Sequence, residues 1–193
     1  MIQTVTRTLA DTERGRVLLA IARESLAESF GLASGRAGVA DRPEPWLAEP
    51  GATFVTLRRN GLLRGCVGTL HAYRPLADDV RANARAAAFS DTRFPPLTRD
   101  EFAAVDLEIS LLSTPEPLSV ASEAEAVTVL RPGIDGVILE YRTCRSTFLP
   151  QVWEQLPDPR EFLAHLKHKA GLSPTFWHAG LRLWRYTVTK WEE

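Results

Sequence analysis

The chain has few of the features that would assign it quickly to a chemical class. Only two cysteines and one methionine occur among its 193 residues, and its net charge is −1. A chain without an excess of basic residues lacks the charge that binding to nucleic acid requires. The phosphate-binding and nucleophile motifs G-x-x-x-x-G-K-[ST], G-x-G-x-x-G and G-x-S-x-G are also absent. We therefore expect no nucleic-acid partner, and the sequence indicates no cofactor.

Long hydrophobic runs are also missing. The segment from Met1 to Arg16 has no apolar stretch of the kind found in a signal peptide, and the apolar run 17–22 is too short to span a bilayer. We expect no membrane association and a cytoplasmic location. In that compartment Cys66 and Cys144 are expected to remain reduced thiols.

Apolar periodicity and turn residues predict helices and hairpins in a mixed order. Asn60-Gly61 between two β-like runs is typical of a tight hairpin turn. Residues 31–51 are rich in Gly, Ala and Pro and are expected to form a long surface loop anchored by Trp46. Because no regular βαβ alternation occurs, the sequence predicts an α+β fold of mostly antiparallel sheet with flanking helices. The expected helices are 11–30, 75–89, 122–130 and 158–170, and the expected strands are 53–58, 62–70, 105–113, 134–142, 145–149 and 182–189.

The stretch Arg64-Gly65-Cys66-Val67-Gly68-Thr69 is the main chemical candidate. Glycine weakens a strand and often marks a close approach to the backbone, and here two glycines flank a thiol. In a regular strand Arg64 and Cys66 would share a face, where a guanidinium stabilises a thiolate. Cys66 is therefore a candidate nucleophile or ligand. The alternative is a small buried cysteine that packs as a hydrophobic residue.

Three further polar residues are candidate neighbours of this thiol. Asp91 and Arg93 follow a predicted helix, where they either lock a turn as an ion pair or place Arg93 against an anionic ligand. Glu108 lies in the middle of an apolar strand. It either faces solvent on the open side of the sheet or serves as an acid/base group.

The histidines give a weaker signal. Glu161, His165 and His168 are spaced so that their side chains lie near one face of the last long helix. This is not a standard zinc spacing, so a solvated outer face is the expected arrangement and no metal site is predicted. His71 follows the Cys66 strand and would serve as its base only if the chain turns back.

Several segments together resemble a known family. Residues 63–69 (LRGCVGT) are similar to the LRGCIGT signature of AMMECR-type domains, and residues 91–97 (DTRFPPL) resemble the family's D-x-RFPPL segment. The bacterial form of the family is called AmmeMemoRadiSam system protein A. The likeness runs in order from about Phe54 to Tyr186 and includes residues 107–110, 131–136, 148–153 and 169–172.

The resemblance implies two unequal lobes with a cleft near the cysteine motif. Residues 1–193 are expected to form a single AMMECR-type domain, with two interleaved subdomains as an alternative. Bacterial and archaeal members accompany a Memo-like protein and a radical-SAM protein, while the activity of the family is not established. Some relatives carry a second cysteine where this chain has Lys167. A mechanism that needs two thiols is therefore not expected here.

Three hypotheses follow from the residues and the resemblance together. In the first, an enzyme-like site acts on an unknown small molecule. The second is a non-enzymatic adaptor or ligand-binding module with a structural Cys66, and the third is a metal-handling partner that uses Cys66 with a histidine. For the first, the candidate catalytic residues are Cys66 and Glu108, and the candidate binding residues are Arg64, Gly65, Gly68, Thr69, Asp91, Arg93 and His165.

Overall fold

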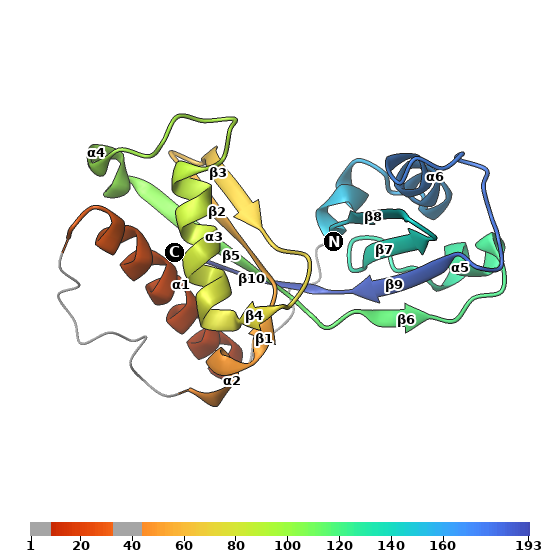
Figure 1. Ribbon diagram of the computed structural model, residues 1–193, viewed down its shortest axis with the longest axis horizontal. Coiled ribbons are helices and arrows are strands. Elements are labelled where there is room, and N and C mark those ends of the chain that lie inside the picture. The colour runs from red at the N-terminus through yellow and green to blue at the C-terminus, as the bar shows by residue number, and fades with distance from the viewer. Residues whose placement is uncertain (1–8, 33–43) are drawn as a thin grey trace. The chain divides into compact units, whose positions relative to one another are not determined.

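The computed structural model describes residues 9–32 and 44–193, which fold into two compact units (Figure 1). Unit 1 comprises the described residues up to Leu112 together with Thr189–Glu193, and unit 2 is Ser113–Val188. Unit 2 is thus inserted into the chain of unit 1, and each unit has its own hydrophobic core. None of the described helices is long and apolar enough to cross a membrane.

Unit 1 is built on a four-stranded sheet of order β10-β5-β2-β3, and α1 and α3 lie together on one face of it (Figure 1). Strand β2 pairs antiparallel with both β3 and β5. A two-stranded ladder, β1-β4, lies beside the start of α3. The elements are α1 (Leu9–Ser29), α2 (Pro45–Ala48), β1 (Pro50–Gly51), β2 (Thr53–Arg59), β3 (Leu62–Gly68), β4 (Arg74–Pro75), α3 (Leu76–Phe89), α4 (Arg99–Phe102), β5 (Val105–Leu112) and β10 (Val188–Glu192).

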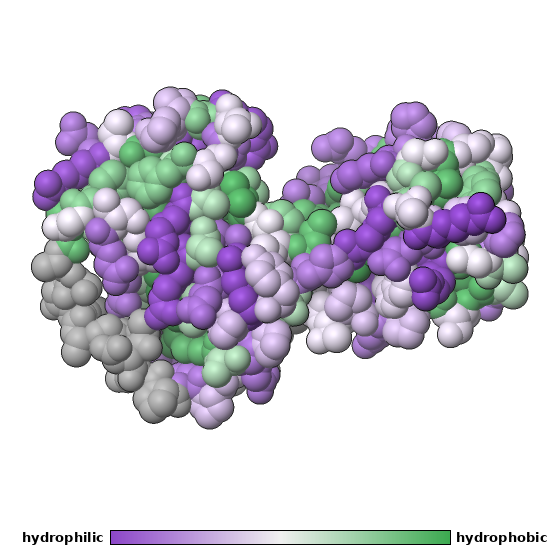
Figure 2. Space-filling view, in the orientation of Figure 1, coloured by the Kyte–Doolittle hydropathy of each residue, from purple (hydrophilic) through white to green (hydrophobic). Residues whose placement is uncertain are grey.

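Helix α3 packs unusually close to β3. A Cβ atom placed on Gly65 would lie 2.1 Å from the carbonyl oxygen of Ala87, so only glycine permits this approach. The alanines of α3 keep its inner face small, and Val55 and Leu57 of β2 fill the space beneath it. The outer side of α3 carries charged residues, and Figure 2 shows hydrophilic side chains gathered there. This amphipathic pattern holds α3 against the sheet.

A buried carboxylate joins the elements around α3. Asp79 is fully buried, and its Oδ2 accepts hydrogen bonds from the backbone N–H and the hydroxyl of Thr53 at 2.8 and 2.7 Å. Asn83 and Thr69 also donate to this carboxylate, and the Nε of Arg74 donates at 2.8 Å. A buried charge is tolerated only when it is paired and hydrogen-bonded in this way. Asp79 therefore ties α3 to β2, to the end of the cysteine motif and to β4.

Unit 2 contains a four-stranded sheet of order β6-β9-β7-β8, in which every pair is antiparallel. Helix α6 begins at the N-cap Asp158, and Gly171 with a φ of +79° follows its end. In the core of unit 2 the rings of Trp153 and Phe162 stack with their centroids 3.8 Å apart. The elements are β6 (Glu116–Leu118), α5 (Glu123–Val129), β7 (Gly136–Tyr141), β8 (Cys144–Phe148), a 3₁₀ helix (Pro150–Glu154), α6 (Pro159–Lys169) and β9 (Arg182–Tyr186).

The predicted α+β fold with antiparallel sheets is confirmed, and two local predictions are wrong. The expected strand 182–189 is two strands in different sheets, β9 and β10, because the chain changes sheets at Thr187 without any break in β-like sequence. Part of the expected loop 31–51 is ordered as α2 and β1, since Leu47 is buried in the core of unit 1. The rest of that loop, residues 33–43, lies outside the described residues. The short elements α4 and β6 were not predicted.

We predict that Asp79→Ala lowers the free energy of unfolding by about 3 to 5 kcal/mol, because it leaves the buried donors around this position without an acceptor. Urea denaturation at neutral pH measures the change. Asp78→Ala is the matched control, since Asp78 lies in the same helical turn with its side chain 58% exposed. The control should cost no more than about 1 kcal/mol. Equal losses in the two variants would contradict the assigned role of Asp79.

Candidate functional site

Cys66 lies on β3, which is an edge strand of the sheet in unit 1. Its side chain is half-buried, and the hydroxyl of Thr56 donates a hydrogen bond to its sulfur at 3.3 Å. Thr56 pairs with Cys66 on one side and with Glu108 of β5 on the other. Because directly opposed residues in antiparallel strands share a face, these three side chains form a row across the sheet. Since Val55 and Leu57 face the helices, the row lies on the opposite face.

The backbone of Cys66 is held by an ion pair from the segment that follows α3. Asp91 Oδ2 accepts a hydrogen bond from the Cys66 N–H at 2.8 Å, and Arg93 Nη2 donates to the Cys66 carbonyl at 3.3 Å. Arg93 also donates two hydrogen bonds to the Asp91 carboxylate, at 2.9 and 2.7 Å. The pair therefore takes the place of a further strand at this point of the edge, and blocks backbone pairing with another chain there.

Asp91 and Arg93 stabilise each other's charged forms. The hydrogen bonds from Arg93 hold the pKa of Asp91 well below its usual range, and the Cys66 N–H adds to this effect. The hydrogen bond to Asp91 raises the pKa of Arg93, with smaller contributions from the charges of Asp91 and Cys66. The Arg93 side chain is 55% exposed, whereas that of Asp91 is 6% exposed. Arg93 is thus a cation held at the Cys66 backbone, and its side chain is exposed enough to meet a ligand.

Arg64 does not lie beside the thiol as a regular strand would place it. Leu57 pairs with Gly65 but Arg58 pairs with Leu63, so Arg64 is the extra residue of a β-bulge. Its guanidinium instead donates two hydrogen bonds to Glu101 of α4, at 3.1 and 3.0 Å. The expected pairing of this side chain with Cys66 is therefore wrong, and the bulge is the physical reason.

Glu101 is the centre of a second charged cluster. Thr98 and Glu101 form a capping box at the start of α4, and Arg59 adds an ion pair at 3.0 Å. The hydrogen bond from Arg64 lowers the pKa of Glu101 from 4.5 to about 2, and the backbone N–H of Thr98 also contributes. The guanidinium carbons of Arg64 and Arg93 lie 5.9 and 5.6 Å from the ring centre of Phe94. Phe94 therefore joins the Glu101 cluster to the Cys66 site.

Other predicted binding residues are engaged in packing. At Gly65 the close neighbour is the backbone of α3, and a Cβ on Gly68 would lie 2.3 Å from the ring of Phe54. The Thr69 hydroxyl donates to the buried carboxylate of Asp79 at 2.8 Å. The close approaches that the two glycines indicate are thus made by the protein's own atoms.

Glu108, the predicted acid/base residue, forms ion pairs with two basic side chains. Its carboxylate forms ion pairs with Arg58 at 3.5 Å and with Lys190 at 3.6 Å, and its side chain is 13% exposed. Two strand spacings separate it from Cys66, which corresponds to about 10 Å between backbones. Glu108 therefore shares the sheet face of the thiol but lies too far away to exchange a proton with it directly. An intervening group would have to carry the proton between them.

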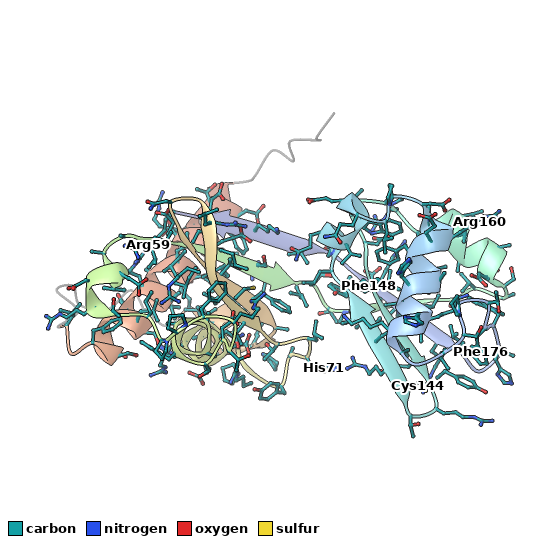
Figure 3. The ribbon with its side chains drawn as sticks, turned by 90° about the horizontal axis from the view of Figure 1, so that it is seen from above. Arg59, His71, Cys144, Phe148, Arg160 and Phe176 are labelled. Atoms are coloured by element: carbon teal, nitrogen blue, oxygen red, sulfur yellow. The ribbon has the colours of Figure 1, made fainter. Side chains whose placement is uncertain are left out.

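His165 lies in unit 2, on α6, and is exposed. Within residues 9–32 and 44–193 no three His, Cys, Asp or Glu side chains form a group that could hold a metal ion. At the position of the relatives' second cysteine, Lys167 is fully buried and donates to Glu123 at 2.8 Å. Cys144 lies at the tip of the β7–β8 hairpin in unit 2, and the exposed His71 follows β3 (Figure 3).

Sequence reasoning missed three members of the site: Thr56, Phe94 and Glu101. The pattern Thr98-x-x-Glu101 is a capping-box signature and could have indicated α4. No comparable signal marks Thr56, because its role depends on the register between β2 and β3. Phe94 is recognisable from the sequence as a neighbour of Asp91 and Arg93 after the helix, but it was given no role in the site.

We predict that Glu101→Gln destabilises the protein at pH 7 by about 1 to 2 kcal/mol, and that this difference shrinks as the pH falls. Because the pKa of Glu101 is lowered to about 2 in the folded protein, its stabilisation is complete above 4.5 and is lost as the pH falls toward 2. Urea denaturation of both proteins across this pH range measures the effect. Asp100→Asn, at the exposed neighbouring position, is the control. A difference that is independent of pH would contradict the assigned ion pair.

Comparison with known proteins places this fold and its motifs in one family. The AMMECR1 family model matches residues 19–191. A protein of Methanothermobacter thermautotrophicus is 37% identical over 183 residues, covering 94% of this chain and 95% of that protein. A protein of Saccharolobus solfataricus is 38% identical over 171 residues, covering 86% of this chain and 74% of that protein. The crystal structure of an uncharacterized protein from Pyrococcus horikoshii matches with a TM-score of 0.77 and 31% identity, over 94% of this chain and 92% of that one. The chain belongs to the AMMECR1 family.

Proposed function

We propose that this chain is an enzyme-like domain whose reactive group is the Cys66 thiol, and that it acts on a small molecule with Memo-like and radical-SAM partners. The observation that carries the proposal is the ordered surrounding of the sulfur. Thr56 donates to it, and Arg93, which is held by Asp91, donates to the carbonyl oxygen of the same residue. A cysteine that only packs as a hydrophobic residue needs no hydroxyl donor to its sulfur. The partners are proposed from the family resemblance alone.

The residues have distinct roles in this proposal. Cys66 attacks or binds the substrate through its sulfur. Arg93, whose side chain is about half exposed, binds an anionic part of the substrate. Asp91 is a positioning residue, because it is nearly buried and fixes both the Cys66 backbone and the Arg93 guanidinium. Glu108 moves a proton on a substrate that reaches along the row from Cys66 past Thr56.

A cytoplasmic location belongs to the same proposal. Cys66 and Cys144 are both free thiols. Reduced thiols are the normal state of cysteine in the cytoplasm, and chemistry at Cys66 requires the reduced form.

The reactivity of the thiol tests the proposal. We expect iodoacetamide to modify Cys66 in the folded protein faster than in the urea-unfolded protein, because a reactive thiol gains its reactivity from its folded surroundings. Arg93→Gln should slow this modification several-fold, because it removes the cation from the surroundings of Cys66. Mass spectrometry of peptides containing Cys66 and Cys144 gives both rates in one sample.

Arg85→Gln is the matched control for the charge change, since Arg85 is exposed on α3 in the same unit. This variant should react at the rate of the unmodified sequence. If Cys66 reacts no faster in the folded protein than in the unfolded one, the proposal of a reactive thiol fails.

The alternative function is a non-enzymatic adaptor or ligand-binding module. It is favoured by the engagement of Gly65, Gly68 and Thr69 in packing, which explains much of the motif without any substrate. Glu108, already paired with Arg58 and Lys190, also fits a structural role.

Partner binding and activity in cells separate the two functions. Under the enzyme proposal, Cys66→Ser keeps its affinity for a purified Memo-like protein but fails to restore the phenotype of a strain that lacks this gene. Under the adaptor function, both binding and restoration survive the substitution. Cys144→Ser is the control and should behave as the unmodified sequence in both assays. Calorimetric titration gives the affinity.

A further inference from the structure

Unit 2 contains a hollow that none of the preceding roles uses. Its volume is about 360 Å³, and its lining is mostly polar. This size is within the range of small-molecule sites. The lining residues include Ser113, Glu116, Arg131, Arg185, Tyr186 and Thr187, all of which belong to unit 2.

Arg131 is held firmly at this hollow. Its Nε and Nη2 donate to Asp135 at 3.0 and 2.6 Å, and its backbone N–H donates to the same carboxylate at 2.9 Å. Asp135 is fully buried, whereas the Arg131 side chain is 47% exposed. A guanidinium has five N–H donors, so the bonds to Asp135 orient Arg131 without using all of them. Arg131 therefore offers pre-positioned donors to a ligand.

The ion pair between Arg185 and Glu116 is weak. Glu116 of β6 pairs with Arg185 of β9, and the distance from Glu116 Oε2 to Arg185 Nε is 3.7 Å, which is too long for a hydrogen bond. The Glu116 side chain is 71% exposed. An exposed ion pair of this kind contributes little stability, so an incoming anion can displace Glu116 at small cost.

We infer that this hollow binds a small anion, a carboxylate or a phosphate, between Arg131 and Arg185. With Glu116 in place the charges of Arg131, Asp135, Arg185 and Glu116 cancel, and its displacement leaves one positive charge for the ligand. Arginine suits this task because its planar donors match carboxylate and phosphate oxygens. Ser113 and Thr187 also line the hollow, and the backbone N–H of Thr187 donates to the Ser113 hydroxyl at 3.0 Å, which orders this part of the lining. The site is independent of Cys66, which lies in unit 1.

Titration of the full-length chain with inorganic phosphate, and separately with succinate, tests the inference. Backbone amide signals in nitrogen–proton correlation spectra report binding at each residue. We expect saturable shifts at Ser113 and Thr187. Arg185→Gln should weaken binding roughly tenfold, because it removes a charge-assisted hydrogen bond, whereas Glu116→Gln should strengthen it roughly threefold. Arg131 is left unchanged, since its removal would leave Asp135 buried without its partner.

Arg160→Gln is the matched control for Arg185→Gln. Arg160 carries the same charge in the same unit, lies exposed at the start of α6 and does not line the hollow (Figure 3). The control should bind as the unmodified sequence does. Saturation by phosphate, by succinate or by both supports the site and identifies the anion. Absence of saturable shifts at the hollow overturns the inference, as does equal weakening in Arg160→Gln or weaker binding in Glu116→Gln.

Discussion

The fold of unit 1 depends on keeping one carboxylate charged inside the protein. Asp79 has no contact with solvent, and it is tolerated because Thr53, Thr69, Arg74 and Asn83 all donate to it. These donors come from β2, from the segment after β3, from β4 and from α3 itself. The carboxylate therefore fixes the start of α3 against β2 and the end of the cysteine motif, and the missing side chain of Gly65 permits the close approach near the other end of the helix.

A similar arrangement of an aspartate, an arginine and a backbone N–H occurs at two other places in the described residues. In each case an aspartate accepts a hydrogen bond from a backbone N–H and from an arginine, so that an ion pair is tied to the backbone. The difference lies in how much of the arginine is exposed. The guanidinium that is bonded to Asp79 is 24% exposed, whereas the other two are about half exposed and remain available to a ligand. The three carboxylates are Asp79, Asp91 and Asp135, and their backbone donors are Thr53, Cys66 and Arg131.

The cysteine motif thus has two explanations that act together. Its glycines are required by packing, against α3 on one side and against Phe54 on the other. Its cysteine, by contrast, makes one side-chain contact that packing does not require, with the Thr56 hydroxyl, while the Asp91–Arg93 pair holds the backbone of the same residue. Fold and chemistry therefore draw on different residues of one short segment. This division is why substitution of Cys66 is informative about function, whereas substitution of Gly65 would report mainly on stability.

The sequence by itself determined most of the longer local elements and the family. Asn60-Gly61 predicted its hairpin, Asp158 and Gly171 the ends of α6, and the cysteine motif the family relationship, since these depend on residues close together in the chain. Only the tertiary structure decided what happens between distant residues. Because of the bulge at Arg64, that side chain binds Glu101. Asp91, which follows the C-terminal end of α3, accepts a hydrogen bond from the backbone of Cys66. Register and packing set such contacts, and neither is a property of a local sequence pattern.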